Sequence, residues 1–69
     1  MTTFDFKIIS QTGIPGISLI CPQNEDAYNY LVEEADMTTL IDGSSPIDRD
    51  QVGDFISDAE SAHLCSLYL

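Results

Sequence analysis

The sequence predicts a small α+β fold in which a mixed four-stranded sheet packs against two helices, in the order ββαβαβ. Three observations support this prediction. Short apolar segments open, interrupt and close the chain, two segments between them have helical periodicity, and a turn rich in glycine joins the first two strands. Connections through helices favour parallel strands, whereas a hairpin is antiparallel. The sheet is therefore expected to be mixed, with both helices on one face.

The first two strands are expected to form a hairpin. Residues 3–10 (TFDFKIIS) alternate apolar and polar side chains, with the period of two that is typical of a half-buried strand. Residues 11–16 contain two glycines and a proline, which is typical of a turn, and residues 17–21 (ISLIC) form a second apolar strand. The loop between them is longer than the tight two-residue type.

The first helix is expected to begin after Asn24, a favourable N-cap, and to end near Ala35. Glu25 and Asp26 occupy its first turn, where carboxylates interact favourably with the helix dipole. The side expected to pack on the sheet carries Ala27, Tyr28, Leu31, Val32 and Ala35. The outer side carries Asp26, Asn29, Tyr30 and Glu33, with Glu34 at its flank.

The second half of the chain is expected to supply a strand, a helix and a strand. Residues 37–41 (MTTLI) are rich in β-branched side chains and predict the third strand, followed by a loop over residues 42–46. Asp48 resembles the first residue of a capping box and predicts a helix over residues 49–62. Residues 64–69 (LCSLYL) suit a terminal strand. The buried side of this helix is expected to carry Val52, Phe55, Ile56, Ala59 and His63.

The length of 69 residues predicts a single domain over residues 1–69 with a thin core. Domains of this size often need a disulfide, a metal or a second subunit, so homodimerisation stays open. Cys21 and Cys65 are expected to be free thiols, with one disulfide as the alternative. No signal-peptide pattern and no membrane-spanning apolar run is visible, so we expect a cytoplasmic protein that does not contact membranes.

The charge of the chain is strongly unbalanced. Twelve acidic residues face only Lys7 and Arg49, which gives a formal net charge of −10. This value exceeds the magnitude of roughly 2–8 that solubility requires of a small domain. It disfavours direct binding to nucleic acid or to anionic membranes and favours a basic partner. The alternative is an ordinary acidic protein whose charge has no specific partner.

The acidic residues are expected to be organised on the helices. Asp50, Asp54 and Asp58 recur every four residues on the outer side of the second helix, about 6 Å apart along its axis. Their mutual repulsion, together with Gly53 in the helix, costs local stability, which is more common at functional sites than elsewhere. Such a row resembles the phosphates of a nucleic-acid strand in charge and roughly in spacing. The expected partner-binding residues are Asp50, Asp54, Asp58, Asp26, Glu33 and Glu34, with Tyr30 as an aromatic anchor. The alternative is a solvated helix face.

The sequence contains few residues that could form a catalytic or a metal-binding site. Residues 48–53 match three positions of a calcium-binding EF-hand loop, but Val52 and Ala59 occupy positions where oxygen ligands are needed. His63 and Cys65 are close in sequence, yet no third group is available to orient them, and His63 is expected to pack on the apolar side of its helix. We therefore expect a binding protein without catalytic residues, metal or cofactor.

In length, in net charge and in the carboxylate rows of its two helices, the chain resembles the small acidic phage-encoded inhibitors of bacterial defence. These are the anti-CRISPR and anti-restriction proteins, several of which act as nucleic-acid mimics. The resemblance implies an inhibitor that occupies the basic groove of a CRISPR effector or a similar nucleic-acid-binding complex in a bacterial host. The alternative is a small interaction subunit or antitoxin-like protein that binds through an apolar surface or an exposed edge strand.

Overall fold

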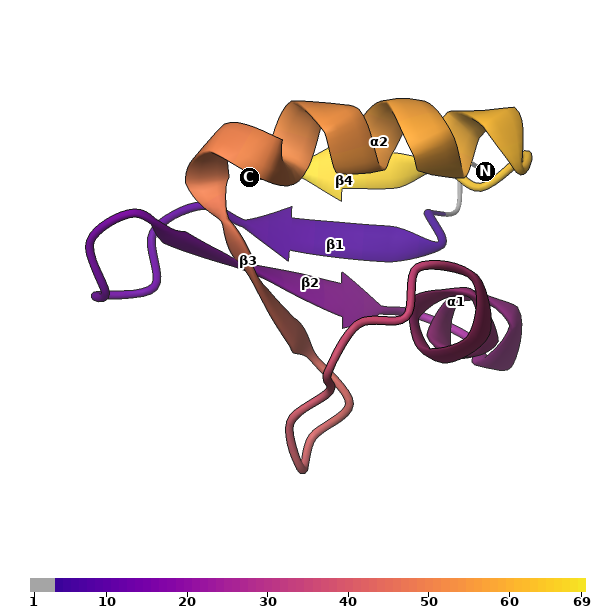
Figure 1. Cartoon of the computed structure of the whole chain (residues 1–69), viewed down its shortest axis with the longest axis horizontal. Helices are drawn as coiled ribbons and strands as arrows, with labels where there is room; N and C mark the ends of the chain where they lie inside the picture. The colour runs from indigo at the N-terminus through magenta and orange to yellow at the C-terminus, as the bar shows by residue number, and fades with distance from the viewer. Residues whose placement is uncertain (1–3) are drawn as a thin grey trace.

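The structure is a computed structural model that describes residues 4–69, and it confirms the predicted α+β fold. The strands are β1 (Phe6–Ile9), β2 (Ile17–Pro22), β3 (Ser45–Asp48) and β4 (Ser66–Tyr68). The helical segments are α1 (Glu25–Asn29), η1 (Tyr30–Glu34), η2 (Arg49–Gln51) and α2 (Val52–Ser61). The four strands form one sheet in the order β3-β2-β1-β4. In Figure 1, α2 extends along this sheet and α1 lies near one end of it.

β1 and β2 form the predicted antiparallel hairpin, in which Ile8 lies opposite Ile20. The first strand is shorter than the expected range of residues 3–10, of which residue 3 lies outside the described residues. The connecting loop depends on its glycines. Gly13 and Gly16 have φ angles of +84° and +77°, a left-handed conformation that glycine adopts without steric cost.

The sheet is mixed, as predicted. β4 pairs with β1 in parallel, with Ser66 beside Phe6, whereas β3 pairs with β2 in antiparallel, with Ile47 opposite Ser18. The side chains of β1 alternate between the two faces, so Phe6 is fully buried and Lys7 is exposed. The two faces of the sheet therefore have different environments.

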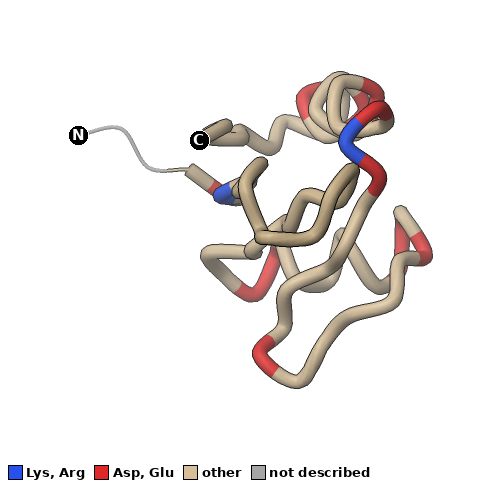
Figure 2. The backbone as a smooth tube through the Cα atoms, turned by 90° about the vertical axis from the view of Figure 1, so that its left-hand side faces the viewer, with Lys and Arg blue, Asp and Glu red and all other residues tan. Residues whose placement is uncertain are grey.

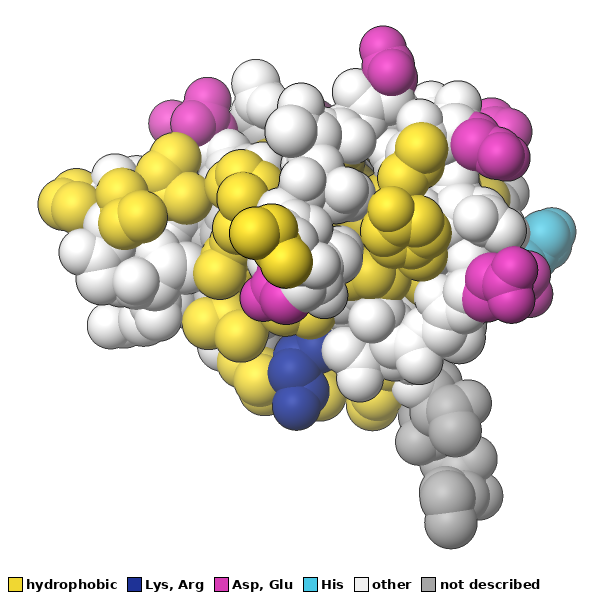
Figure 3. All heavy atoms as spheres, turned by 90° about the horizontal axis from the view of Figure 1, so that it is seen from below, with side chains coloured by type: hydrophobic (Ala, Val, Ile, Leu, Met, Phe, Trp, Pro, Cys, Tyr) yellow, Lys and Arg dark blue, Asp and Glu magenta, His cyan; other side chains and the backbone are white. Residues whose placement is uncertain are grey.

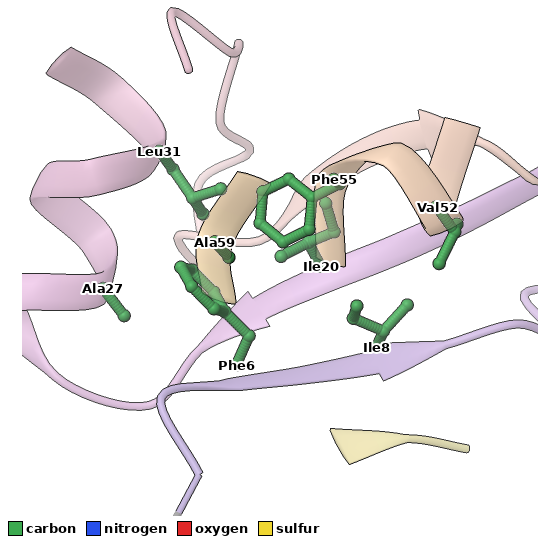
Figure 4. Packing of buried hydrophobic residues seen from close by; sticks show 8 residues of the cluster. All are labelled: Phe6, Ile8, Ile20, Ala27, Leu31, Val52, Phe55 and Ala59. Atoms are coloured by element: carbon green, nitrogen blue, oxygen red, sulfur yellow. The ribbon is translucent and has the colours of Figure 1, made fainter. Parts of the chain in front are cut away.

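The core lies between one face of the sheet and the helices. In Figure 4, Phe55 and Val52 of α2 lie over Ile20 and Ile8 of the sheet. Because α1, η1 and α2 all contribute to this one cluster, the helices cover the same face of the sheet, as predicted. The buried hydrophobic cluster consists of Phe6, Ile8, Ile20, Ala27, Leu31, Val52, Phe55 and Ala59.

The prediction of the third strand was wrong. Residues 37–41 form an irregular loop, and β3 lies in the segment that was expected to be a loop and the start of a helix. The hydroxyl of Ser45, which is fully buried, donates a hydrogen bond to the carbonyl of Thr38 (2.7 Å) and so holds this loop beside the start of β3. The pairing of residues 45–48 with β2 outweighs the intrinsic preference of the β-branched residues in 37–41 for a strand. Pro46, which has no N–H group, is tolerated because β3 is an edge strand.

The first helix begins at the predicted N-cap, where the side chain of Asn24 accepts a hydrogen bond from the N–H of Ala27 (2.8 Å). Its C-terminal half is a π-helical turn, η1, closed by a hydrogen bond from the N–H of Ala35 to the carbonyl of Tyr30 (2.9 Å). The predicted buried side is wrong at Tyr28 and Val32, which are 40% and 41% exposed.

Tyr30 turns toward the core in their place, although the sequence places it on the outer side. Its ring makes edge-to-face contacts with Phe6 and Phe55, at centroid distances of 6.0 Å and 6.2 Å. These aromatic contacts are worth about 0.5–1.5 kcal/mol each beyond simple burial, which explains why the helix presents this side.

The second helix follows the predicted range in two pieces, the 3₁₀ turn η2 and the α-helix α2. The expected capping box is wrong, because the side chain of Asp48 makes no capping hydrogen bond and the chain passes directly from β3 into η2. Val52, Phe55 and Ala59 are buried, as predicted, and Ile56 is half-buried.

His63 was expected on the buried side but is exposed, because α2 ends before it. It has a φ of 65° and forms the left-handed residue of a Schellman motif. Its N–H donates to the carbonyl of Glu60 (3.0 Å), and the N–H of Leu64 donates to the carbonyl of Ala59 (2.9 Å). Leu64 then packs against the core.

Asp5 joins three segments at the start of β1. Its carboxylate accepts hydrogen bonds from the side-chain amide of Asn24 (2.9 Å) and from the N–H of Cys65 (2.8 Å). The N–H of Cys65, followed by the amide of Asn24, stabilises the charged form and holds the pKa of Asp5 below its ordinary value of 3.8. One carboxylate therefore connects β1, the cap of α1 and the approach to β4.

Among residues 4–69, no helix is long and apolar enough to cross a membrane. The thiols of Cys21 and Cys65 are free, the first half-buried and the second exposed.

We predict that His63→Gly stabilises the protein by about 1 kcal/mol, because glycine adopts the left-handed conformation without the steric cost of a Cβ atom. Urea denaturation at about pH 8, where an ordinary histidine is neutral, measures this change. His63→Ala is the matched control, since it removes the imidazole and keeps the strain. Equal stability of the two variants would contradict the assignment of the Schellman motif.

We predict that Asp5→Ala lowers the free energy of unfolding at neutral pH by about 1 kcal/mol, since Asp5 is only partly shielded from water. The folded pKa of Asp5 is depressed, so its contribution is complete above the ordinary pKa of 3.8 and is lost as the pH falls through the folded value. The difference between wild type and variant should therefore shrink below about pH 4. Denaturation curves of wild type and variant recorded across this range measure the convergence, and a difference that stays constant with pH would contradict the role of the charged carboxylate.

Candidate functional site

The acidic residues lie mainly on the helical side of the molecule. In Figure 2, red acidic positions mark the coil of α2, the first helix and the loop that precedes β3. Arg49 lies between Asp48 and Asp50, but its guanidinium donates to the carbonyl of Ser10 (2.6 Å) in the hairpin loop. This cation is therefore directed toward the hairpin.

A groove of about 850 Å³ runs between η1 and α2 and borders β3. Its lining has two chemical parts, an apolar floor and an acidic rim, and it contains no lysine, arginine or histidine. The apolar floor includes Tyr30, Met37, Ile47 and Phe55. The acidic rim consists of Glu34, Asp48, Asp54 and Asp58.

Tyr30 lines the groove and is held in position by the core. Its ring contacts Phe6 and Phe55, which themselves pack edge to face at a centroid distance of 5.1 Å. Burial, followed by the negative charges of Asp58 and Glu34, raises the pKa of Tyr30 above its ordinary value of 10.0. Carboxylates from two different helical segments thus act on one phenol.

The structure brings together four of the residues that the sequence predicts as partner-binding. Glu34, Asp54, Asp58 and Tyr30 all line the groove. Tyr30 lies there as a half-buried member of an aromatic cluster, and not as the outward-facing anchor that the helical periodicity suggested.

The other three predicted residues lie apart from the groove. Asp26 and Glu33 are exposed on the first helix and do not line it. Asp50 is exposed on the 3₁₀ turn η2, so the spacing of an α-helical row applies to Asp54 and Asp58 but not to Asp50.

Sequence reasoning missed the groove itself. The sequence pattern predicts a helix cap at Asp48 and places Met37 in a strand that the structure does not contain, and it assigns Ile47, which lies in β3, to no element. One signal was available, because Asp58 follows Phe55 by three residues on α2, which places an acidic side chain beside an aromatic ring.

The other residues with catalytic or metal-binding potential, His63, Cys65 and Cys21, do not line the groove. His63 and Cys65 are exposed, and the N–H of Cys65 is bound to Asp5. Burial and the charge of Asp42 raise the pKa of the Cys21 thiol, which disfavours the nucleophilic thiolate. Within residues 4–69, no three His, Cys, Asp or Glu side chains are grouped so that they could hold a metal ion.

Comparisons of the chain with protein-family models, with curated proteins and with solved structures found no match. The functional argument therefore rests on the geometry and charge of the chain.

We predict that Asp58→Asn and Glu34→Gln each lower the pKa of Tyr30 toward its ordinary value, because each removes a negative charge that opposes ionisation of the phenol. NMR of tyrosine labelled at Cζ, titrated upward from about pH 8 and assigned with Tyr30→Phe, measures the midpoint. Asp50→Asn serves as the control, since Asp50 lies outside the groove. An unchanged midpoint in both groove variants would show that these carboxylates do not face the phenol.

Proposed function

We propose that this protein is an acidic binding protein that occupies a basic, nucleic-acid-binding surface of a protein partner and so acts as a nucleic-acid mimic. The observation that carries this proposal is that carboxylates from η1, from the end of β3 and from α2 line one groove. The lining of this groove has no basic side chain. The carboxylates belong to Glu34, Asp48, Asp54 and Asp58.

The physical basis is the way in which proteins hold nucleic acids. Lysine and arginine side chains neutralise phosphates in a basic channel. The same cations also form charge-assisted hydrogen bonds with carboxylates. The net charge of −10 also attracts such a surface from a distance and speeds association. A purely structural role does not account for like charges placed on both sides of one groove, because their repulsion destabilises the fold.

The class of partner follows from the resemblance to phage-encoded inhibitors. A CRISPR effector grips its guide and target strands in a positively charged channel, which is the kind of surface that a small acidic protein can occupy. In this proposal the protein acts stoichiometrically in the cytoplasm of a bacterial host as an anti-CRISPR or anti-restriction inhibitor.

A second candidate function is favoured by the face of the sheet that the helices leave uncovered. Its side chains are Lys7, Ile9, Leu19, Cys21 and Leu67, all half-buried except the exposed Lys7. In Figure 3, hydrophobic side chains form several patches on the lower face of the molecule, with acidic side chains both among them and near the margins. An interaction subunit would bind through the apolar sheet face, or add a strand to β4, which pairs on one side only.

We predict that the triple variant Glu34→Gln, Asp54→Asn, Asp58→Asn, which removes three carboxylates of the groove, binds a guide-loaded CRISPR effector at least about tenfold more weakly than wild type. Displacement of labelled target DNA from a panel of such effectors measures this affinity. Binding should also weaken steeply as the salt concentration rises from about 0.05 M to 0.2 M.

The matched control carries Glu25→Gln, Asp36→Asn and Glu60→Gln, which change the net charge equally at exposed positions outside the groove. It should lose much less affinity. If the two triple variants bind as tightly as wild type and salt has little effect, the mimic is excluded and the apolar sheet face becomes the binding surface. If no effector in the panel is bound, the proposed class of partner is wrong.

A further inference from the structure

The groove between η1 and α2 combines two properties that rarely serve the same ligand. Its floor is apolar and aromatic and includes the paired rings of Tyr30 and Phe55, while its rim carries four carboxylates from η1, β3 and α2. A flat acidic face would be sufficient for attraction to any basic surface. The apolar floor also requires that the ligand has an apolar part and a shape that fits the groove.

Several classes of ligand do not match this combination. Phosphate groups are repelled by the four carboxylates of the rim. Hydrated divalent cations require a compact set of oxygen ligands, which an apolar floor does not offer. An uncharged apolar segment would cover the carboxylates without neutralising them, at a cost in desolvation.

An arginine side chain matches both parts of the lining. Its guanidinium is planar, stacks on aromatic rings and forms paired hydrogen bonds with carboxylates, and it is more weakly hydrated than the ammonium of lysine. Its aliphatic stem packs on apolar surface while the charge reaches the rim. Glu34 of η1 and Asp58 of α2 line the groove together with Tyr30, so a guanidinium on that ring would lie near carboxylates of both helical segments.

The groove is longer than one side chain. A volume of about 850 Å³ accommodates a short segment of chain. Met37 and Ile47, which are half-buried, offer apolar contacts beside the aromatic centre. An arginine flanked by aliphatic residues on one face of a segment would fill it, as amphipathic helices fill apolar grooves elsewhere.

We propose that this groove is the specific receptor for an arginine-bearing, apolar-flanked segment of the protein partner, an inference that rests on the proposed function and names the chemistry of its central contact. The groove is preorganised for this ligand. Tyr30 is held by ring contacts with Phe6 and Phe55, and the carboxylates of Glu34 and Asp58 already line the groove beside it. A bound cation relieves the repulsion between them without rearranging the core.

The test uses the full chain and three peptides of about 12 residues that share one amphipathic design. The first carries arginine beside leucine, the second replaces arginine with lysine, and the third replaces it with citrulline, the neutral isostere. Titrations followed by amide NMR at low salt give both the affinity and the residues that are contacted.

The arginine peptide is expected to bind roughly fivefold tighter than the lysine peptide and to shift the amide signals of Tyr30, Glu34, Asp54 and Asp58. The citrulline peptide should bind roughly a hundredfold more weakly than the arginine peptide. The double variant Glu34→Gln, Asp58→Asn should weaken the arginine peptide about tenfold, whereas the matched control Glu25→Gln, Glu60→Gln should change it by less than about twofold. Urea denaturation of each variant verifies that it is folded.

Failure of this inference and failure of the proposed function are separable. If arginine and lysine peptides bind equally and both double variants weaken them equally, the attraction is a general acidic field, and the arginine receptor is wrong while the mimic stands. If the arginine peptide binds the groove as expected but CRISPR effectors are bound by neither wild type nor variants, the proposed function is wrong and the receptor stands. Absence of peptide binding at this groove overturns the inference.

Discussion

The structure depends on the edge-to-face contact between Phe6 and Phe55, whose ring centroids lie 5.1 Å apart. It joins the central strand β1 to α2, and Tyr30 completes the cluster by joining η1 to both. A domain of 69 residues buries little apolar surface, so three aromatic rings form a large share of what holds its helices to the sheet. The distance between η1 and α2, and therefore the width of the groove, follows from this cluster.

The charge of the chain acts against this small core. A net charge of −10 opposes compaction, and the structure places many of the carboxylates on helical segments whose other side supplies the core. The consequence is a molecule with two dissimilar surfaces, an acidic groove on the helical side and a largely apolar sheet face that carries Lys7. The core and the groove thus share a side chain, since Tyr30 packs against the core and also lines the groove.

Local patterns in the sequence predicted the elements whose structure is decided locally. Asn24 caps the first helix as expected because an N-cap depends on a hydrogen bond three residues away. The hairpin of β1 and β2 follows from alternation and from two glycines with positive φ. Of the candidate site, the acidic side of α2 at Asp54 and Asp58 was visible in the same way, because helical periodicity places these two residues on one side of α2.

By itself, the sequence determined the α+β class, the hairpin, the approximate ranges of both helices and the excess of carboxylates on them, since these depend on contacts between near neighbours. Only the tertiary structure decided that Ser45–Asp48 is the third strand, that Tyr30 faces inward while Tyr28 and Val32 face outward, and that Glu34 and Asp58 line the same groove. The physical reason is that these features depend on partners distant in sequence. Strand β3 exists because β2 offers it an unpaired edge, and Tyr30 turns inward because Phe6 and Phe55, one from a strand and one from a helix, meet beside it.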